Sequence, residues 1–115
     1  MKVLPTLQVP ARPEVFVIGD AAYLEADGTP LPMVAPVAMQ MADTTATNIQ
    51  RLLAHQPLET FHFSDPGSLA TIGRNAAVAS IGGFNFKGFP AWVVWLTIHL
   101  VRIIGFRNKL AVLLN

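Results

Sequence analysis

The chain has 115 residues, of which 52% are hydrophobic and only 13% are charged, and its formal net charge is +1. This apolar excess indicates that part of the surface contacts a partner protein or a membrane. The near-neutral net charge argues against a general nucleic-acid binder, which would carry a basic surface. The absence of cysteine excludes a disulfide framework and a thiolate metal site.

Residues 1–13 carry three prolines and predict an extended lead-in. Residues 14–22 then pass from four consecutive apolar residues into Gly19, Asp20 and two alanines. Such a run predicts a buried strand that ends at Gly19, with Asp20 at its carboxyl end. In open α/β folds ligands bind at that edge, and an ionised carboxylate accepts hydrogen bonds from ribose or ribityl hydroxyls. The alternative is a core strand that ends in an ordinary turn.

After a turn-rich loop over residues 23–32, apolar side chains at helical spacing predict a helix that ends before Pro57. Pro36 falls in its first turn, where proline is tolerated. Gln40 lies at the edge of the apolar stripe, where its amide can donate or accept. The stripe itself consists of Ala38, Met41, Ala42, Thr45, Ile49, Leu52 and Leu53.

From Leu58 to Lys87 the apolar period changes to two, and turns that contain glycine, at residues 65–67, 73–75 and 82–83, separate the apolar segments. This pattern predicts a small antiparallel meander with one buried face, beginning with Phe61 and Phe63. Lys87 follows a strand whose two phenylalanines face the other way. The simplest interpretation is an edge lysine that protects the sheet from mispairing.

Residues 89–105 are apolar almost all round and, as a helix, would reach about 25 Å, which is short of a comfortable bilayer span. Two tryptophans lie near one end, and Arg102, Arg107 and Lys109 lie near the other. This arrangement suits a helix in the interface of an anionic membrane. A buried helix at a protein contact is the alternative.

The sequence contains no set of side chains that suggests catalysis by the protein alone. The histidines, His55, His62 and His99, are too scattered for metal ligands, and no G-x-S-x-G or suitably spaced carboxylate pair occurs. We therefore predict no catalytic residue and no metal site. Redox chemistry would have to come from a bound cofactor.

Five short sequence segments, or blocks, resemble in their order and spacing the C-terminal part of type II NADH:quinone oxidoreductases, the alternative NADH dehydrogenases of respiratory membranes. The resemblance runs from about Leu7 to Asn115 and implies an FAD-dependent oxidoreductase that passes electrons from NADH through FAD to a membrane quinone. No G-x-G-x-x-G occurs here, so we expect a fragment that is inactive alone. The blocks are residues 14–22, 32–40, 70–74, 86–92 and 105–110.

The resemblance also implies site residues. Many relatives carry Ala-Gln-x-Ala-x-Gln beside the flavin and the quinone entrance; here residues 35–40 keep the second glutamine and replace the first by proline. Backbone N–H groups at the helix N-terminus are expected to point toward the flavin ring, and a lysine ammonium to stabilise developing negative charge. The implied FAD residues are Gly19, Asp20, Val37, Ala38 and Lys87, and the implied quinone residues are Pro36, Gln40 and Lys87.

The predicted fold class is α+β, a fragment of a two-dinucleotide-binding-domain flavoprotein. Residues 1–57 would be the C-terminal part of the FAD-binding domain, residues 58–88 the meander, and residues 89–115 apolar helices for membrane or dimer contact. Expected partners are quinone, NADH through a domain missing here, the membrane surface and a second copy, at the cytoplasmic side of the cell membrane.

Two alternatives stay open. One is a non-catalytic dimerisation or membrane-docking module. The other is a fragment of a related flavin-dependent quinone reductase such as a sulfide:quinone oxidoreductase, although that chemistry uses a redox-active cysteine pair and the chain has no cysteine.

Overall fold

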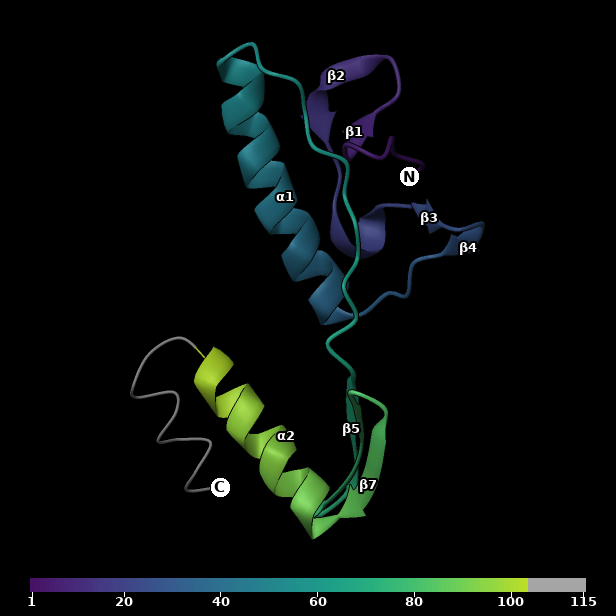
Figure 1. Cartoon of the computed structure of the whole chain (residues 1–115), viewed down its shortest axis with the longest axis vertical. Helices are drawn as coiled ribbons and strands as arrows, with labels where there is room; N and C mark the ends of the chain where they lie inside the picture. The colour runs from purple at the N-terminus through teal and green to yellow at the C-terminus, as the bar shows by residue number, and fades with distance from the viewer. Residues whose placement is uncertain (104–115) are drawn as a thin grey trace. The chain divides into compact units, whose positions relative to one another are not determined.

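The computed structural model describes residues 1–103, which form two compact units divided between Asp65 and Pro66. Within these residues the first unit contains one α-helix and two two-stranded antiparallel sheets, and the second contains one α-helix and one three-stranded antiparallel sheet, which confirms the α+β class (Figure 1). The second of the expected C-terminal helices, with Arg107 and Lys109, lies outside the described residues.

The first unit begins with two antiparallel pairs of short strands. β1 (Gln8–Val9) pairs with β2 (Arg12–Phe16), and β3 (Glu25–Ala26) pairs with β4 (Thr29–Pro30). Asp27 and Gly28 close the second pair with φ of 50° and 76°, the positive values that a two-residue hairpin turn requires. The 3₁₀ turn η1 (Gly19–Ala21) lies between the two pairs.

The prediction of a buried strand over residues 15–18 is wrong. β2 ends at Phe16 and is mostly exposed, and its partner is the short antiparallel β1. Val17 instead donates its N–H to the carbonyl oxygen of Leu7 at 3.1 Å, and the side chains of Val17 and Ile18 pack against the core of the unit. This segment is apolar because Phe16, Val17 and Ile18 cover the small core of the unit. It is not a strand that a sheet buries on both faces.

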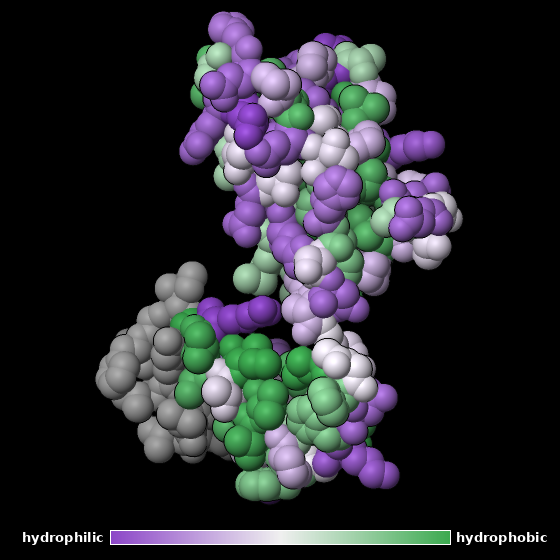
Figure 2. Space-filling view, viewed as in Figure 1, coloured by the Kyte–Doolittle hydropathy of each residue, from purple (hydrophilic) through white to green (hydrophobic). Residues whose placement is uncertain are grey.

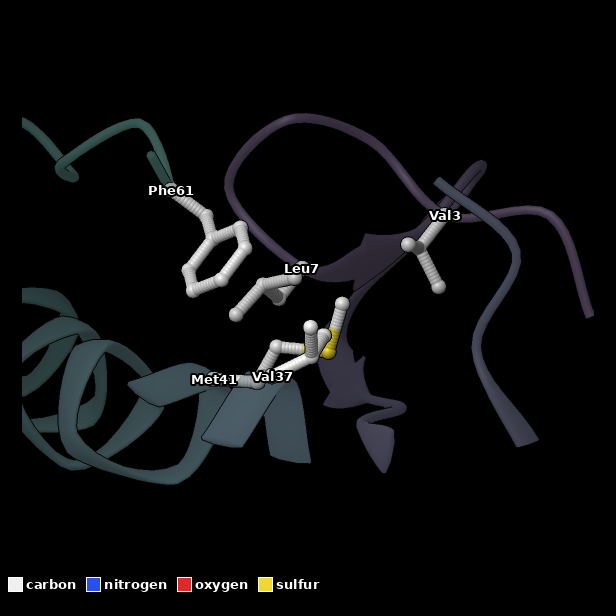
Figure 3. Close-up of a cluster of buried hydrophobic side chains, with 5 residues drawn as sticks. All are labelled: Val3, Leu7, Val37, Met41 and Phe61. Carbon is white, nitrogen blue, oxygen red and sulfur yellow. The ribbon is translucent and has the colours of Figure 1, made fainter. Parts of the chain in front are cut away.

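Helix α1 (Ala35–Leu53) has Pro36 in its first turn, as predicted. Its buried side packs against Val3, Leu7 and Phe61, and Figure 3 shows this cluster around Met41. The stripe prediction is confirmed for Met41 and Thr45 but wrong for Ala42, Ile49, Leu52 and Leu53, which are exposed because the unit covers one side of the helix. The buried helix residues are Val37, Met41, Thr45 and Asn48.

A second apolar row on α1 faces solvent, and we call it the outer row. Its members recur at intervals of four and three residues, the spacing of a helix–helix packing seam. Met39, Ile49 and Leu53 are 50%, 44% and 77% exposed. The outer row consists of Ala35, Met39, Ala42, Ala46, Ile49 and Leu53.

The second unit contains the predicted antiparallel meander, in the order β5 (Ser68–Gly73), β6 (Ala76–Ile81) and β7 (Phe84–Gly88). Gly82 and Gly83, both with positive φ, form the tight turn between β6 and β7.

The meander was expected to begin near Leu58, and that boundary is wrong. Phe61 belongs to the core of the first unit, where it is 6% exposed and donates its N–H to Pro5 O at 2.9 Å. Residues 57–64 are therefore held by α1 and the N-terminal segment, and the unit that contains the sheet begins at Pro66.

Helix α2 (Phe89–Arg102) covers one face of the meander. The contact is made by alanine, leucine and aromatic side chains, and Figure 2 shows hydrophobic residues gathered over this helix. Within residues 1–103, no helix combines the length and the apolar character needed to cross a membrane. The packed residues are Leu69, Ala77, Ala79 and Phe86 from the sheet and Ala91, Trp92 and Trp95 from α2.

A row of α2 residues at intervals of four also faces solvent, and we call it the α2 row. Phe89, Val93 and Val101 are 60%, 41% and 71% exposed, and Thr97 is exposed as well. Three of its four side chains are thus apolar and open to water, which is unusual for a soluble surface.

We expect the chain to self-associate, because the outer row and the α2 row both present apolar side chains to water. Light scattering at increasing concentration should give an average mass above that of the 12.4 kDa monomer. Ile49→Gln combined with Leu53→Gln should lower this mass, whereas Asp43→Gln combined with Thr47→Gln, on another side of α1, should not. A stable monomer at high micromolar concentration would contradict the prediction.

Candidate functional site

The turn η1, which carries Gly19 and Asp20, rests on helix α1. Gly19 has φ of +63°, a conformation that favours glycine. A Cβ added to it would lie 3.5 Å from Cβ of Ala38, so the turn sits against the first part of the helix. The N–H of Gly19 donates to Sδ of Met41 at 3.3 Å. The structure thus brings together Gly19, Asp20 and Ala38, three of the residues that the sequence assigned to one ligand.

The carboxylate of Asp20 faces solvent on this turn. Within residues 1–103 it forms no hydrogen bond or ion pair, so both of its oxygens can accept bonds from a ligand. Three residues further along the chain, the hydroxyl of Tyr23 donates to the Glu25 carboxylate at 2.5 Å. This hydrogen bond raises the pKa of Tyr23.

The backbone N–H groups of Val37 and Ala38, which the resemblance directs toward a flavin ring, are already hydrogen-bonded within the helix. Both donate to the carbonyl oxygen of Val34, at 3.1 and 3.3 Å, because they close the first turn of α1. The side chain of Val37 is 4% exposed and belongs to the core. Ala38 is half-buried beside Gly19, so any ligand contact here would use its surface rather than its N–H.

Gln40 forms a reciprocal pair of hydrogen bonds with the backbone of Ser64. Its Nε2 donates to the Ser64 carbonyl at 2.8 Å, and its Oε1 accepts the Ser64 N–H at 3.0 Å. A side-chain amide has two N–H donors and two lone pairs on its oxygen. One donor and one lone pair of Gln40 therefore remain for a ligand.

Two further polar side chains of α1 bind the segment that follows the helix, residues 57–64, to which Ser64 belongs. Asn48, fully buried, donates to the carbonyl oxygens of Thr6 and Glu59 and accepts the Glu59 N–H. Arg51 donates to the Pro57 carbonyl and pairs with the Glu59 carboxylate. Three polar side chains thus hold residues 57–64 along the helix, a role that the sequence pattern did not reveal.

Lys87 belongs to the second unit, on the face of the meander that α2 leaves uncovered. Strand register places it beside Val78, which in turn pairs with Ala70. Within the described part of the chain its ammonium has no hydrogen-bond acceptor or ion-pair partner. The sequence placed Lys87 on the face opposite Phe84 and Phe86; Phe86 packs on the α2 side as expected, whereas Phe84 is 78% exposed.

This uncovered face contains an open hollow of about 400 Å³. Cross-strand pairing places Ser68, Ser80 and Asn85 in one row and Ala70, Val78 and Lys87 in the next. The hollow therefore combines hydroxyl and amide groups with one ammonium over a small apolar floor. Sequence reasoning singled out Lys87 but missed the two serines and Asn85, which the two-residue alternation of each strand indicates once the register is known.

Residues 66–115 match a family model described as the NDH2 C-terminal domain. The whole chain is 43% identical to the type II NADH:quinone oxidoreductase Ndh of Mycobacterium tuberculosis, of which it covers 25%. It is 38% identical, over 95% of its length, to NdhA of the same organism, of which it covers 23%.

A plant protein is also similar. Over 85% of the chain, identity is 38% to the alternative NAD(P)H-ubiquinone oxidoreductase C1, chloroplastic/mitochondrial, of Arabidopsis thaliana, of which 20% is covered. The chain thus spans about a quarter or less of the length of these curated relatives.

Proposed function

Because the chain belongs to the type II NADH:quinone oxidoreductases, with an NDH2 C-terminal domain over residues 66–115, we propose that it contributes part of an FAD site and of a quinone site. The activity proposed for the whole protein is electron transfer from NADH to a quinone. Bound FAD would supply that redox chemistry. The chain's own residues would bind, orient and stabilise charge.

The observation that carries the proposal is the Gly19–Asp20 turn held on α1. An exposed, unpaired carboxylate on a fixed turn fits the ribityl hydroxyls of a flavin, because it can accept hydrogen bonds but not donate them. The turn packs against the first part of α1, where Gly19 lies beside Ala38. We assign Gly19, Asp20 and the surface of Ala38 to the flavin, with Val37 supporting them from the core.

For the quinone we propose Gln40 and, beside it in the first turn of α1, Pro36. The N–H of Gln40 that is not bound to Ser64 is suited to a quinone carbonyl, since it is a neutral donor already oriented by two hydrogen bonds. Pro36 offers only an apolar, half-buried ring. It replaces the glutamine that many relatives carry, so one polar contact of those relatives is absent or supplied elsewhere.

Lys87 is proposed to stabilise negative charge that develops on a flavin or quinone oxygen. Its exposed ammonium has no acidic partner within residues 1–103, so its charge is available to a ligand. The Ser68, Ser80 and Asn85 side chains of the same face can hold such a ligand by hydrogen bonds.

The two exposed apolar rows support contacts beyond this chain. The outer row of α1 has the spacing for packing on a further helix, and we propose that other parts of the complete protein pack there. The α2 row is proposed to lie on the cytoplasmic surface of the cell membrane or at a homodimer contact.

Replacing Asp20 by asparagine tests the flavin assignment. In the full-length protein that carries this sequence, we expect Asp20→Asn to weaken FAD binding about ten- to hundredfold, because a charge-assisted hydrogen bond to a hydroxyl becomes a neutral one. FAD retention can be measured by flavin fluorescence on dilution. Asp27→Asn, on the β3–β4 turn, is the matched control and should retain FAD normally. Equal retention by the two variants would remove Asp20 from the flavin site.

A further inference from the structure

We propose that Met41 is a positioning residue, whose thioether sulfur holds the Gly19–Asp20 turn on helix α1. The backbone N–H of Gly19 donates to Met41 Sδ across a distance of 3.3 Å, between residues 22 positions apart in the sequence. The inference rests on the proposed function, because the turn carries the carboxylate assigned to FAD.

The N–H of Gly19 needs an acceptor at this point. Gly19 adopts φ of +63°. The hydrogen bond that closes the 3₁₀ turn runs from the Ala22 N–H to the Gly19 carbonyl at 2.9 Å, so it uses the carbonyl of Gly19 and not its N–H. An N–H group removed from water and left without an acceptor costs free energy. The acceptor in this structure is a side chain on another element, so the turn is tied to the helix rather than only to itself.

Methionine suits this position because it must serve the core and the turn together. Met41 is 1% exposed and packs among Val37, Leu7 and Phe61 (Figure 3). Its thioether is apolar enough for such a core, yet its sulfur retains weak acceptor capacity. Leucine would fill the same space with no acceptor.

Two contacts on α1 fix the turn. The hydrogen bond to Met41 is one, and the packing of the turn against the helix beside Ala38, three residues earlier, is the other. Two attachment points restrict rotation of the turn better than one. The direction of the Asp20 carboxylate should therefore depend on Met41, although Met41 itself touches no ligand.

Amide hydrogen exchange tests the hydrogen bond in the 115-residue chain. Met41→Leu should speed exchange of the Gly19 amide by about three- to tenfold relative to the unchanged chain, as expected for one lost hydrogen bond. Met39→Leu is the matched control, because Met39 lies on the same helix but is 50% exposed. Equal Gly19 exchange in the two variants would overturn the proposal.

A second measurement needs no variant and so does not depend on how Met41→Leu folds. Selenomethionine in place of methionine changes the acceptor atom and keeps the side-chain shape. The Gly19 amide resonance should then move more than those of Ile18 and Asp20. A Gly19 resonance that moves no more than its neighbours would count against the hydrogen bond.

FAD binding by the full-length protein separates this inference from the proposed function. Met41→Leu should raise the dissociation constant of FAD about three- to tenfold, and Met39→Leu should leave it unchanged. Faster Gly19 exchange with unchanged FAD affinity would uphold the anchoring of the turn but remove its flavin role. Unchanged exchange would refute the positioning role whatever the FAD affinity.

Discussion

Replacing Asn48 by leucine is expected to lower the free energy of unfolding of the first unit by about 2 to 4 kcal/mol. Asn48 is fully buried, and its amide makes three hydrogen bonds with the backbone of Thr6 and Glu59, at 2.8 to 3.2 Å. Leucine has a similar volume but would leave two carbonyl oxygens and one N–H without partners. The loss comes from these stranded backbone groups more than from packing.

The two units allow this effect to be localised. Both tryptophans lie on α2 of the second unit, so tryptophan fluorescence reports that unit, whereas far-UV circular dichroism also reports α1. Denaturant unfolding of Asn48→Leu should lower the midpoint seen by dichroism and leave the fluorescence midpoint unchanged. Gln50→Leu, at an exposed position of α1, should cost less than about 0.5 kcal/mol. Similar midpoints for the Asn48 and Gln50 variants would contradict the structural role given to Asn48.

Local sequence patterns predicted helices α1 and α2 and the three paired strands of the meander. The start of α1 at Ala35, the start of α2 at Phe89 and the turn at Gly82-Gly83 all follow from periodicity and turn chemistry within a few residues. Such signals are local, so no knowledge of the rest of the fold is needed to interpret them.

The errors arose where distant contacts decide the structure. Residues 16–18 and residues 61–63 both look like parts of buried strands, yet their apolar side chains pack on α1 and the N-terminal segment instead of forming a buried sheet. The hydrogen bonds of Gln40, Asn48 and Arg51 to backbone groups were equally hidden. A backbone carbonyl or N–H group can belong to any residue, so such pairs leave no pattern in the sequence.

In the candidate site, too, local sequence signals could be interpreted and distant contacts could not. Gly19, Asp20 and Ala38 were identified from the order of short blocks, and the fold brings them together. The part played by Met41 could not be foreseen, because methionine at a helical core position indicates only packing. The sulfur becomes an acceptor only because a turn 22 residues earlier directs an N–H at it.

Gln40→Leu in the full-length protein is expected to reduce kcat/KM for quinone by about five- to a hundredfold, corresponding to about 1 to 3 kcal/mol. The substitution keeps the helix and most of the volume but removes the N–H proposed for the quinone carbonyl. Reduction of the bound flavin by NADH should change little. Stopped-flow measurements of the two half-reactions test this separation.

The hydrogen bonds of Gln40 to Ser64 supply the control for this experiment. Ser64→Pro removes the N–H that Gln40 accepts and leaves the Gln40 amide in place. If Gln40 acts on the quinone, Ser64→Pro should retain most of the quinone activity that Gln40→Leu loses. If the two variants lose quinone activity equally, Gln40 acts by holding residues 57–64 on α1. Equal slowing of both half-reactions by Gln40→Leu would likewise assign Gln40 to the flavin or to the fold, and the quinone assignment would then fail.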